Sequence, residues 1–348
     1  MNTAGYPDYC ADSRVASRAN HGADHCAVTR MSTAGVPPGE RIAFWEAYNA
    51  DALVGLRCSS LSETGLDASL ANYMLDGMRL ADISGNTHQI ERSPALVRSC
   101  PKNSIFACQV VEGRAYFIQH ERCEIVDAGE TIVYDTRRPY IFGFPTGMRQ
   151  FLIDLPADDF RLRFGVDPAR LPLKLAARAG REMLLGRTLR HRLDAFVHHP
   201  THAATAPLAL HATVLLESML RCEMRGSAGS TPALSYLLSA KQLIAERLAD
   251  PALRPQAVAD ALGLSLRHLN RLFATDGQSL DEYIWSKRAS LALADLLDPA
   301  LRGVAIGEIA FRWGFSSHAH FSRAIRERYG ASPSALRAQK RDGGGAAD

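Results

Sequence analysis

Residues 262–273 read Leu262-Gly-Leu-Ser-Leu-Arg-His-Leu-Asn-Arg-Leu-Phe273, and this stretch decides the fold of the last third of the chain. Gly263 permits the positive φ of a tight turn, and Ser265 is a natural N-cap for a helix that begins at the next residue. Apolar residues spaced three and four apart predict the buried face of that helix: Leu266, Leu269 and Phe273. With the helical pattern of Val258–Leu262 before it, the stretch predicts a helix-turn-helix unit.

A second stretch, Ile309-Ala-Phe-Arg-Trp-Gly-Phe-Ser-Ser-His-Ala-His-Phe-Ser-Arg-Ala-Ile325, repeats this pattern. Gly314 matches Gly263, and Arg323 matches Arg271. The segment between the two copies, Leu280–Leu297, is apolar at helical spacing and would form a helix about 27 Å long. Adjacent major grooves on one face of DNA lie about 34 Å apart. The repeat therefore indicates two helix-turn-helix units joined by a helix. The length of this helix is suitable for placing the units in adjacent major grooves.

Positive charge is concentrated in the same region. Residues 233–341 hold 15 Lys and Arg against 10 Asp and Glu, whereas the net charge of the whole chain is only +3. Exposed side chains that donate two hydrogen bonds near the start of a helix are suited to reading bases in the major groove. A solvated charged face is the alternative explanation for a basic surface.

Residues 234–341 resemble the DNA-binding domain of the AraC/XylS family of transcription regulators. Beyond the two stretches quoted above, the matching positions are Tyr283-Ile284, Arg288, Ala292, Leu296-Leu297, Ile306–Ala310, Tyr329-Gly-Ala-Ser-Pro333 and Arg337. The departures are the charged Arg326-Glu-Arg328 and Ala324-Ile325, where a large aromatic residue is usual. The resemblance implies a sequence-specific transcription regulator, more often an activator, and not an enzyme.

The resemblance also implies which residues contact DNA. Base contacts are expected from one face of each second helix: Arg267, Asn270, Arg271, His318, Ser322 and Arg323. Phosphate contacts are expected from Arg326 and Lys287. Helix capping or plain solvent exposure is the alternative for His318 and Ser322.

The N-terminal half has a different texture, in which short apolar or alternating runs stand between turn residues. The expected strands are Met78–Ile83, Phe106–Val111, Ala115–Gln119, Glu124–Val126, Thr131–Asp135, Tyr140–Phe144 and Gln150–Leu155. Short strands at this spacing predict an all-β sandwich or barrel. Helices are expected at Glu40–Ala52, Asp158–Phe164, Arg178–Val197 and Pro207–Met224.

This half resembles the sensor domain of XylS-like regulators, through Phe44-Trp45, His88-Gln-Ile-Glu-Arg92, Val111-Glu-Gly113, Ala128-Gly-Glu130 and Tyr134-Asp-Thr-Arg-Arg-Pro-Tyr140. The resemblance implies a cupin-like half-barrel followed by helices that often mediate dimerisation. The expected fold class is α+β and multidomain, with a β-rich half-barrel and its helices first and an all-α domain last. The expected divisions are a disordered leader (1–38), a sensor and dimerisation domain (39–225, barrel about 56–155, helices about 158–225), a linker (226–232), the DNA-binding domain (233–341) and a tail (342–348).

Effectors in this branch are often small aromatic acids or amines, so the expected partners are operator DNA, RNA polymerase, a small molecule and a second copy of the chain. An anionic aromatic effector needs an arginine and aromatic walls. The side chains that could supply them are Arg92, Tyr134, Arg137, Arg138, Tyr140 and Phe142. Structural packing and surface ion pairs are the alternative for each.

No cofactor or metal is expected, because the barrel region has no H-x-H pair and the chain has no P-loop or G-x-G-x-x-G motif. Two alternatives stay open. One is a regulator whose N-terminal domain only dimerises or binds a protein, and the other is a metal-dependent cupin enzyme fused to a DNA-binding domain. The 7 cysteines form no C-x-x-C pair, and no secretory signal or long uncharged apolar run occurs. These features indicate a cytoplasmic protein with no membrane contact.

Overall fold

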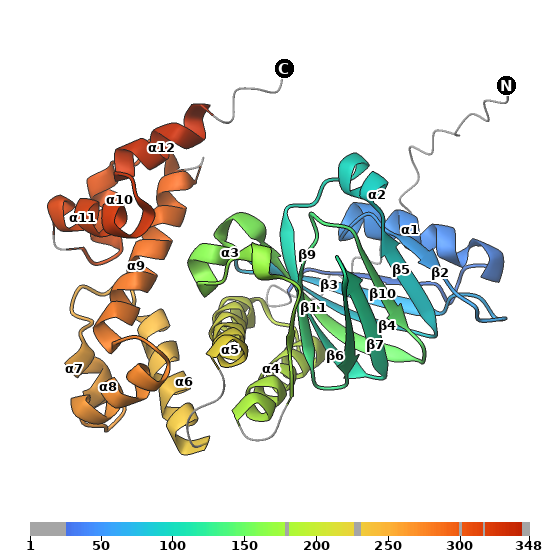
Figure 1. Cartoon of the computed structure of the whole chain (residues 1–348), viewed down its shortest axis with the longest axis horizontal. Coiled ribbons are helices and arrows are strands. Elements are labelled where there is room, and N and C mark those ends of the chain that lie inside the picture. The colour runs from blue at the N-terminus through green and yellow to red at the C-terminus, as the bar shows by residue number, and fades with distance from the viewer. Residues whose placement is uncertain (1–25, 178–180, 226–230, 299–300, 316, 343–348) are drawn as a thin grey trace.

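The computed structural model describes residues 26–177, 181–225, 231–298, 301–315 and 317–342 (Figure 1). A β-rich part comes first in the chain, and helices follow it. Most of the expected leader, of the linker over 226–232 and of the tail lies outside the described residues.

Two antiparallel sheets face each other in the N-terminal half. The larger has the strand order β1-β3-β4-β11-β6-β9-β12, and the smaller has the order β2-β5-β10-β7-β8. The strands are β1 Val28–Ser32, β2 Arg57–Ser59, β3 Ala68–Leu75, β4 Met78–Gly85, β5 His88–Arg92, β6 Ser104–Glu112, β7 Arg114–Gln119, β8 Arg122–Asp127, β9 Thr131–Asp135, β10 Tyr140–Phe144, β11 Met148–Pro156 and β12 Leu173–Leu175. The described strands thus form an open two-sheet sandwich, as a half-barrel requires, and not a closed barrel.

Aromatic rings fill the space between the two sheets. The ring centroid of Phe117 lies 4.5 Å from that of Tyr134, 5.7 Å from that of Tyr140 and 5.3 Å from that of Phe142. Tyr140, Phe142 and Phe144 alternate along β10, which turns all three toward the facing sheet. Trp45 of α1 (Arg41–Ala52) closes the same core, and α2 (Pro94–Ser99) follows β5.

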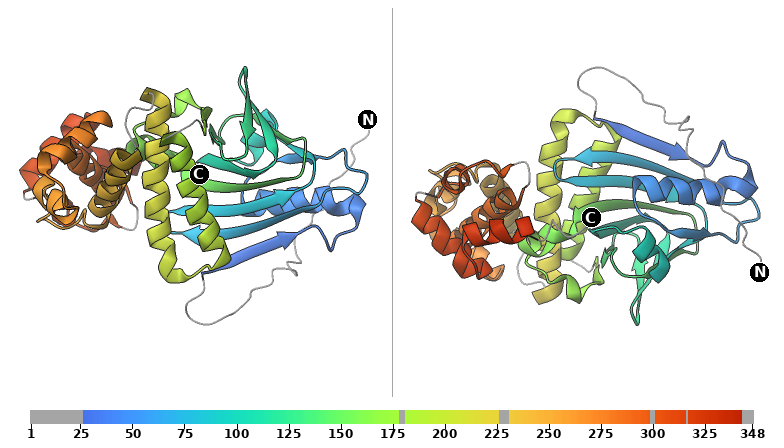
Figure 2. Two further views of the ribbon diagram at one scale, coloured as in Figure 1. Left: turned by 90° about the horizontal axis from the view of Figure 1, so that it is seen from below. Right: turned by 90° about the horizontal axis from the view of Figure 1, so that it is seen from above.

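Helices α3 (Ala157–Phe164), α4 (Arg181–His198) and α5 (Thr205–Arg225) pack in a second core against the larger sheet (Figure 2). Helix α5 lies between this sheet and the C-terminal helices, so side chains around most of its circumference are buried. The segment His202–Met224 is long and apolar enough to cross a membrane, but 56% of its apolar 18-residue window is buried inside the protein. Its apolar character is therefore explained by packing on two sides.

The C-terminal helices form two small cores that share one helix. They are α6 Thr231–Glu246, α7 Pro255–Ala261, α8 Leu266–Thr275, α9 Leu280–Leu297, α10 Ile306–Arg312, α11 His318–Tyr329 and α12 Pro333–Asp342. The first half of α9 packs with α6, α7 and α8, and its second half packs with α10, α11 and α12. Helix α9 is thus the spacer between two helical units.

The expected bounds of β9, β10 and α9 agree with the structure residue for residue. The expectation of a disordered leader up to residue 38 is wrong for Val28–Ser32, which forms β1 and pairs with β3. Within β1 only Met31 is buried, so this edge strand has no clear apolar alternation. Strands β2, β3, β5 and β12 and helix α2 were also not expected.

Replacing Phe117 with alanine should lower the free energy of unfolding by about 3–5 kcal/mol, because the ring contacts three others in a closed core. Urea unfolding of the full chain measures this effect. Ile125→Ala on the neighbouring strand is the matched control, since Ile125 is 46% exposed and its loss should cost less than about 1 kcal/mol. Equal losses in both variants would contradict the assignment of this core.

Candidate nucleic-acid interface

The first helix-turn-helix unit consists of α7, a turn at Gly263 and α8. Gly263 has a φ of +63°, and the Ser265 hydroxyl accepts a hydrogen bond from the amide of His268 at 3.2 Å. Both features confirm the turn and the cap that the sequence predicts. Leu269 and Phe273 of α8 are fully buried.

The predicted base-contacting residues of α8 lie on its outer face. Arg267, Asn270 and Arg271 are all exposed. Arg271 is positioned by a contact of 2.8 Å between its Nη2 and the Nδ1 of His268, one turn earlier. Helix α8 thus carries an apolar inner face and an outer face of hydrogen-bond donors, which is the arrangement that major-groove readout requires.

The second unit repeats this geometry with α10 and α11. Gly314 has a φ of +75°, and Ser317 caps α11 by accepting from the amide of His320 at 3.2 Å. Phe321 and Ile325 are fully buried. The structure places four of the remaining predicted DNA contacts on the other side of α11, with three exposed and Ser322 half-buried: His318, Ser322, Arg323 and Arg326.

Arg288 of α9 ties the two units together. It is buried, and its guanidinium donates to the carbonyl oxygens of Leu248 at 3.0 Å and Asp250 at 2.7 Å, which follow α6. The same guanidinium packs against the turn of the second unit, where a Cβ added to Gly314 would lie 2.8 Å from its Cζ. Glycine at position 314 therefore meets two requirements, the positive φ and the close approach of Arg288.

Lys287 does not lie with the other predicted DNA contacts. Its Nζ forms an ion pair of 2.6 Å with Glu217 of α5 and donates to the backbone oxygen of Arg163 at 2.9 Å. Its side chain is only 19% exposed. In this arrangement Lys287 joins the C-terminal helices to the N-terminal half and is not presented to a phosphate.

Glu217 and Lys287 belong to a buried ionic network that connects the two halves of the chain. Arg221 lies 3.1 Å from Glu217, and Lys241 of α6 lies 2.9 Å from Asp276 at the end of α8. Burial alone would raise the pKa of Glu217, but the positive charges of Lys287, Lys241 and Arg221 overcome it and lower the pKa to about 2. Glu217 is therefore ionised at neutral pH.

The sequence contains one signal for this network. Glu217 is an acidic residue within the strong apolar stripe of Pro207–Met224, and a buried acid needs a cationic partner. The identity of that partner was not accessible, because Lys287 is 70 residues away in the chain.

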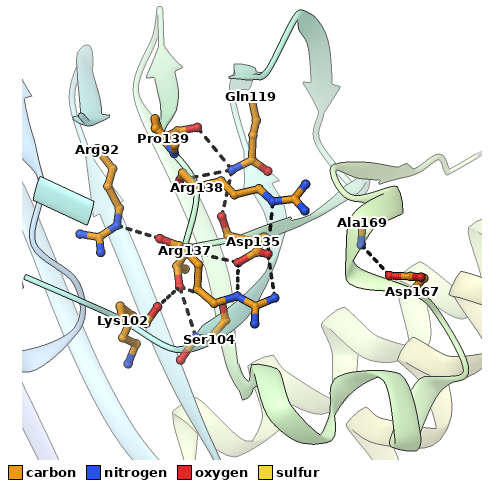
Figure 3. Close-up of polar contacts among 11 residues, drawn as sticks. Arg92, Lys102, Ser104, Gln119, Asp135, Arg137, Arg138, Pro139, Asp167 and Ala169 are labelled. Atoms are coloured by element: carbon orange, nitrogen blue, oxygen red, sulfur yellow. Dashed lines mark hydrogen bonds and ion pairs between the residues drawn. The ribbon is translucent and has the colours of Figure 1, made fainter. Parts of the chain in front are cut away.

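Three of the six predicted effector contacts are arginines, and each has protein partners (Figure 3). Arg92 is completely buried and donates to the carbonyl oxygens of Thr136 at 2.9 Å, Gly55 at 2.6 Å and Cys100 at 2.7 Å. Arg137 binds the carboxylate of Asp135 through Nε and Nη2, each at 2.9 Å, and Arg138 lies 3.6 Å from the same carboxylate. These contacts hold the β9–β10 turn and the segment before β6.

The other three, Tyr134, Tyr140 and Phe142, lie together in the aromatic core between the sheets. Burial raises the pKa of Tyr134 and of Tyr140, so both phenols stay protonated at neutral pH. The cavity beside them has a volume of only about 20 Å³, which is room for about one water molecule. In the described residues, no group of three or more His, Cys, Asp or Glu side chains converges as a metal site.

Comparison with known proteins gives matches to both halves of the chain. A family model described as a helix-turn-helix domain matches residues 258–339, and one described as an AraC-binding-like domain matches residues 45–221. The transcriptional activator NphR of Rhodococcus sp is 26% identical over 280 residues, which are 78% of this chain and 81% of NphR. The transcriptional activator RhrA of Rhizobium meliloti is 31% identical over 101 residues, or 29% of this chain and 32% of RhrA. The crystal structure of the AraC-like transcriptional activator CuxR covers 76% of this chain and 96% of its own, with 22% identity and a TM-score of 0.47.

Gly314→Ala should lower the free energy of unfolding by about 1–3 kcal/mol, because alanine at this positive φ is strained and its Cβ would displace the Arg288 guanidinium. Chemical denaturation of the full chain measures the loss. Gly307→Ala in α10 is the control, since its added Cβ meets nothing within 4 Å. If the two variants were equally stable, the close approach of Arg288 would not constrain position 314.

Glu217→Gln should lower the free energy of unfolding by about 3–5 kcal/mol at neutral pH, because it leaves buried cations without their counter-charge. The pKa of Glu217 is lowered by folding, so its stabilisation is present above about pH 4.5 and is lost as the pH falls toward about 2. The variant should therefore show a shallower decline of stability over this range in denaturation measured as a function of pH. The exposed Glu63→Gln should match the original protein, and a parallel pH profile for Glu217→Gln would contradict the ion pair.

Proposed function

The chain belongs to the AraC family of transcription regulators, and we propose that it activates transcription from operators that its two helix-turn-helix units read in adjacent major grooves. The relatives NphR and RhrA are named transcriptional activators, which supports activation of transcription over repression. Activation makes RNA polymerase a partner. The chain acts in the cytoplasm, where the DNA is.

The observation that carries this proposal is the pair of outward-facing donor surfaces on α8 and α11. Each surface lies opposite a fully buried apolar face, and most of its side chains are exposed. Arginine pairs with guanine through two hydrogen bonds, and asparagine pairs with adenine in the same way. The proposed base contacts are Arg267, Asn270, Arg271, His318, Ser322 and Arg323, and Arg326 is the proposed phosphate contact.

The N-terminal domain binds a small effector, and this binding regulates the DNA-binding domain. Helices α4 and α5 follow the sandwich, and the exposed side of α4 is available to a second copy of the chain. We include a homodimer in the proposal, with the effector shifting the population of the DNA-competent arrangement.

Arg271→Ala and Arg323→Ala should each weaken operator binding by about 10- to 100-fold, because each removes a two-donor contact to a base. Operators are first obtained by sequencing genomic fragments that the protein retains, and affinity is then measured by titration. Arg326→Ala should weaken binding to all DNA sequences alike and reduce its salt dependence by about one charge.

Arg98→Ala is the matched control, since Arg98 is equally exposed but lies on α2 of the N-terminal half. It should leave operator affinity within about twofold. Unchanged affinity in both Arg271→Ala and Arg323→Ala would refute the assignment of α8 and α11 as the reading helices.

A further inference from the structure

A cavity of about 230 Å³ lies where the N-terminal half meets the C-terminal helices. Its walls come from α5 on one side and from α6 and α9 on the other, and the end of α3 and the β3–β4 turn form its rim. Most of the wall is apolar: Ala209, Leu210, Val214, Ile244, Ala245, Leu248, Leu291 and Ala294. An apolar cavity of about 150 Å³ is enough to bind benzene, so this one has room for a single ring with a short substituent.

The charged groups of the cavity differ in whether they have a partner of opposite charge. Lys287 and Glu217 satisfy each other in their ion pair of 2.6 Å. At the rim, Arg163 is half-buried, and its guanidinium forms no ion pair with any side chain that the structure describes. Asp76, also at the rim, is exposed. A half-buried cation without a counter-charge is the group that gains most from an anionic ligand.

The position of Arg163 is fixed by the network already described. Its backbone oxygen accepts the hydrogen bond from Lys287 at 2.9 Å, and Gly165, in a left-handed conformation, ends α3 directly after it. The guanidinium lies beside Gly77 of the β3–β4 turn, where an added Cβ would be 3.8 Å from Nη2. The cation is thus held at the mouth of an apolar cavity.

We propose that this cavity is the effector site, that it takes a compact, mainly apolar monoanion such as a small aromatic carboxylate, and that Arg163 receives the anionic group. This inference rests on the proposed function, because the ligand of the cavity is taken to be the effector that regulates DNA binding. The space between the two sheets, beside the predicted effector contacts Tyr134 and Tyr140, holds only about 20 Å³. The cavity at the junction is about ten times larger.

This location gives a direct route from ligand to DNA binding. A molecule in the cavity contacts α5 of the sensor half and α6 and α9 of the reading half at the same time. It therefore favours the arrangement in which the two halves are docked as described. The ligand acts as an additional packing element between them.

The test measures ligand binding to the full chain without DNA, by calorimetry and thermal shift. The probes are benzoate, phenylacetate and hexanoate, with phenylacetamide as the neutral counterpart of phenylacetate. At saturation at least one carboxylate should raise the Tm by about 2–5 °C. Phenylacetate should bind more tightly than phenylacetamide, and this preference should disappear in Arg163→Ala and persist in Arg163→Lys.

Ala245→Leu fills the cavity and should abolish binding, whereas Ala195→Leu on the exposed face of α4 should leave it unchanged. The proposal is overturned if none of the carboxylates binds, if binding survives Ala245→Leu, or if the preference for the anion survives Arg163→Ala. Operator binding by the same preparations reports separately on the proposed function. Loss of ligand binding with operator binding intact would overturn only the site, and the reverse would overturn only the DNA-reading assignment.

Discussion

Glu217 lies at the junction of α5 with the C-terminal helices, where a carboxylate without partners would cost several kcal/mol. Its two oxygens are taken by Lys287 and Arg221, and the neighbouring Lys241 and Asp276 extend the network to α6 and α8. These buried charges meet partners of opposite charge only when the helices are packed in this arrangement or in one close to it. The docking of the sensor half on the reading half, and with it the cavity between them, depends on this network.

The two halves of the chain bury their polar groups in different ways. Between the sheets, aromatic rings leave almost no free volume, and the guanidinium of Arg92 donates its hydrogen bonds to three backbone carbonyls. At the junction, charged pairs stand beside an apolar space that no side chain fills. The space between the sheets is therefore filled, whereas the junction keeps an apolar space of about 230 Å³. The sandwich serves as a fixed support for α5.

Much of the C-terminal fold was predictable, because its signals are local. Within each unit, the glycine turn, the serine cap and the three-and-four spacing of the second helix are close together in the chain, and α9 was predicted with its observed bounds. Edge strands such as β2 and β12 were not predictable, since three residues are too few for an alternation. The role of Lys287 was misassigned for a related reason: it depends on Glu217, which only tertiary packing brings near. The effector residues were chosen by chemical type alone, and type does not tell whether an arginine is already bonded to carbonyls.

Arg288 has a consequence for the DNA itself. By binding the segment after α6 and packing on Gly314, it braces α9 against both units. An 18-residue helix is about 27 Å long, shorter than the roughly 34 Å repeat of a straight duplex. Under the proposed binding in adjacent major grooves, we expect the duplex to curve toward the protein so that both units reach their grooves. Curvature is easiest at flexible pyrimidine–purine steps, so we expect base pairs between the two contacted segments to show a sequence preference without being touched.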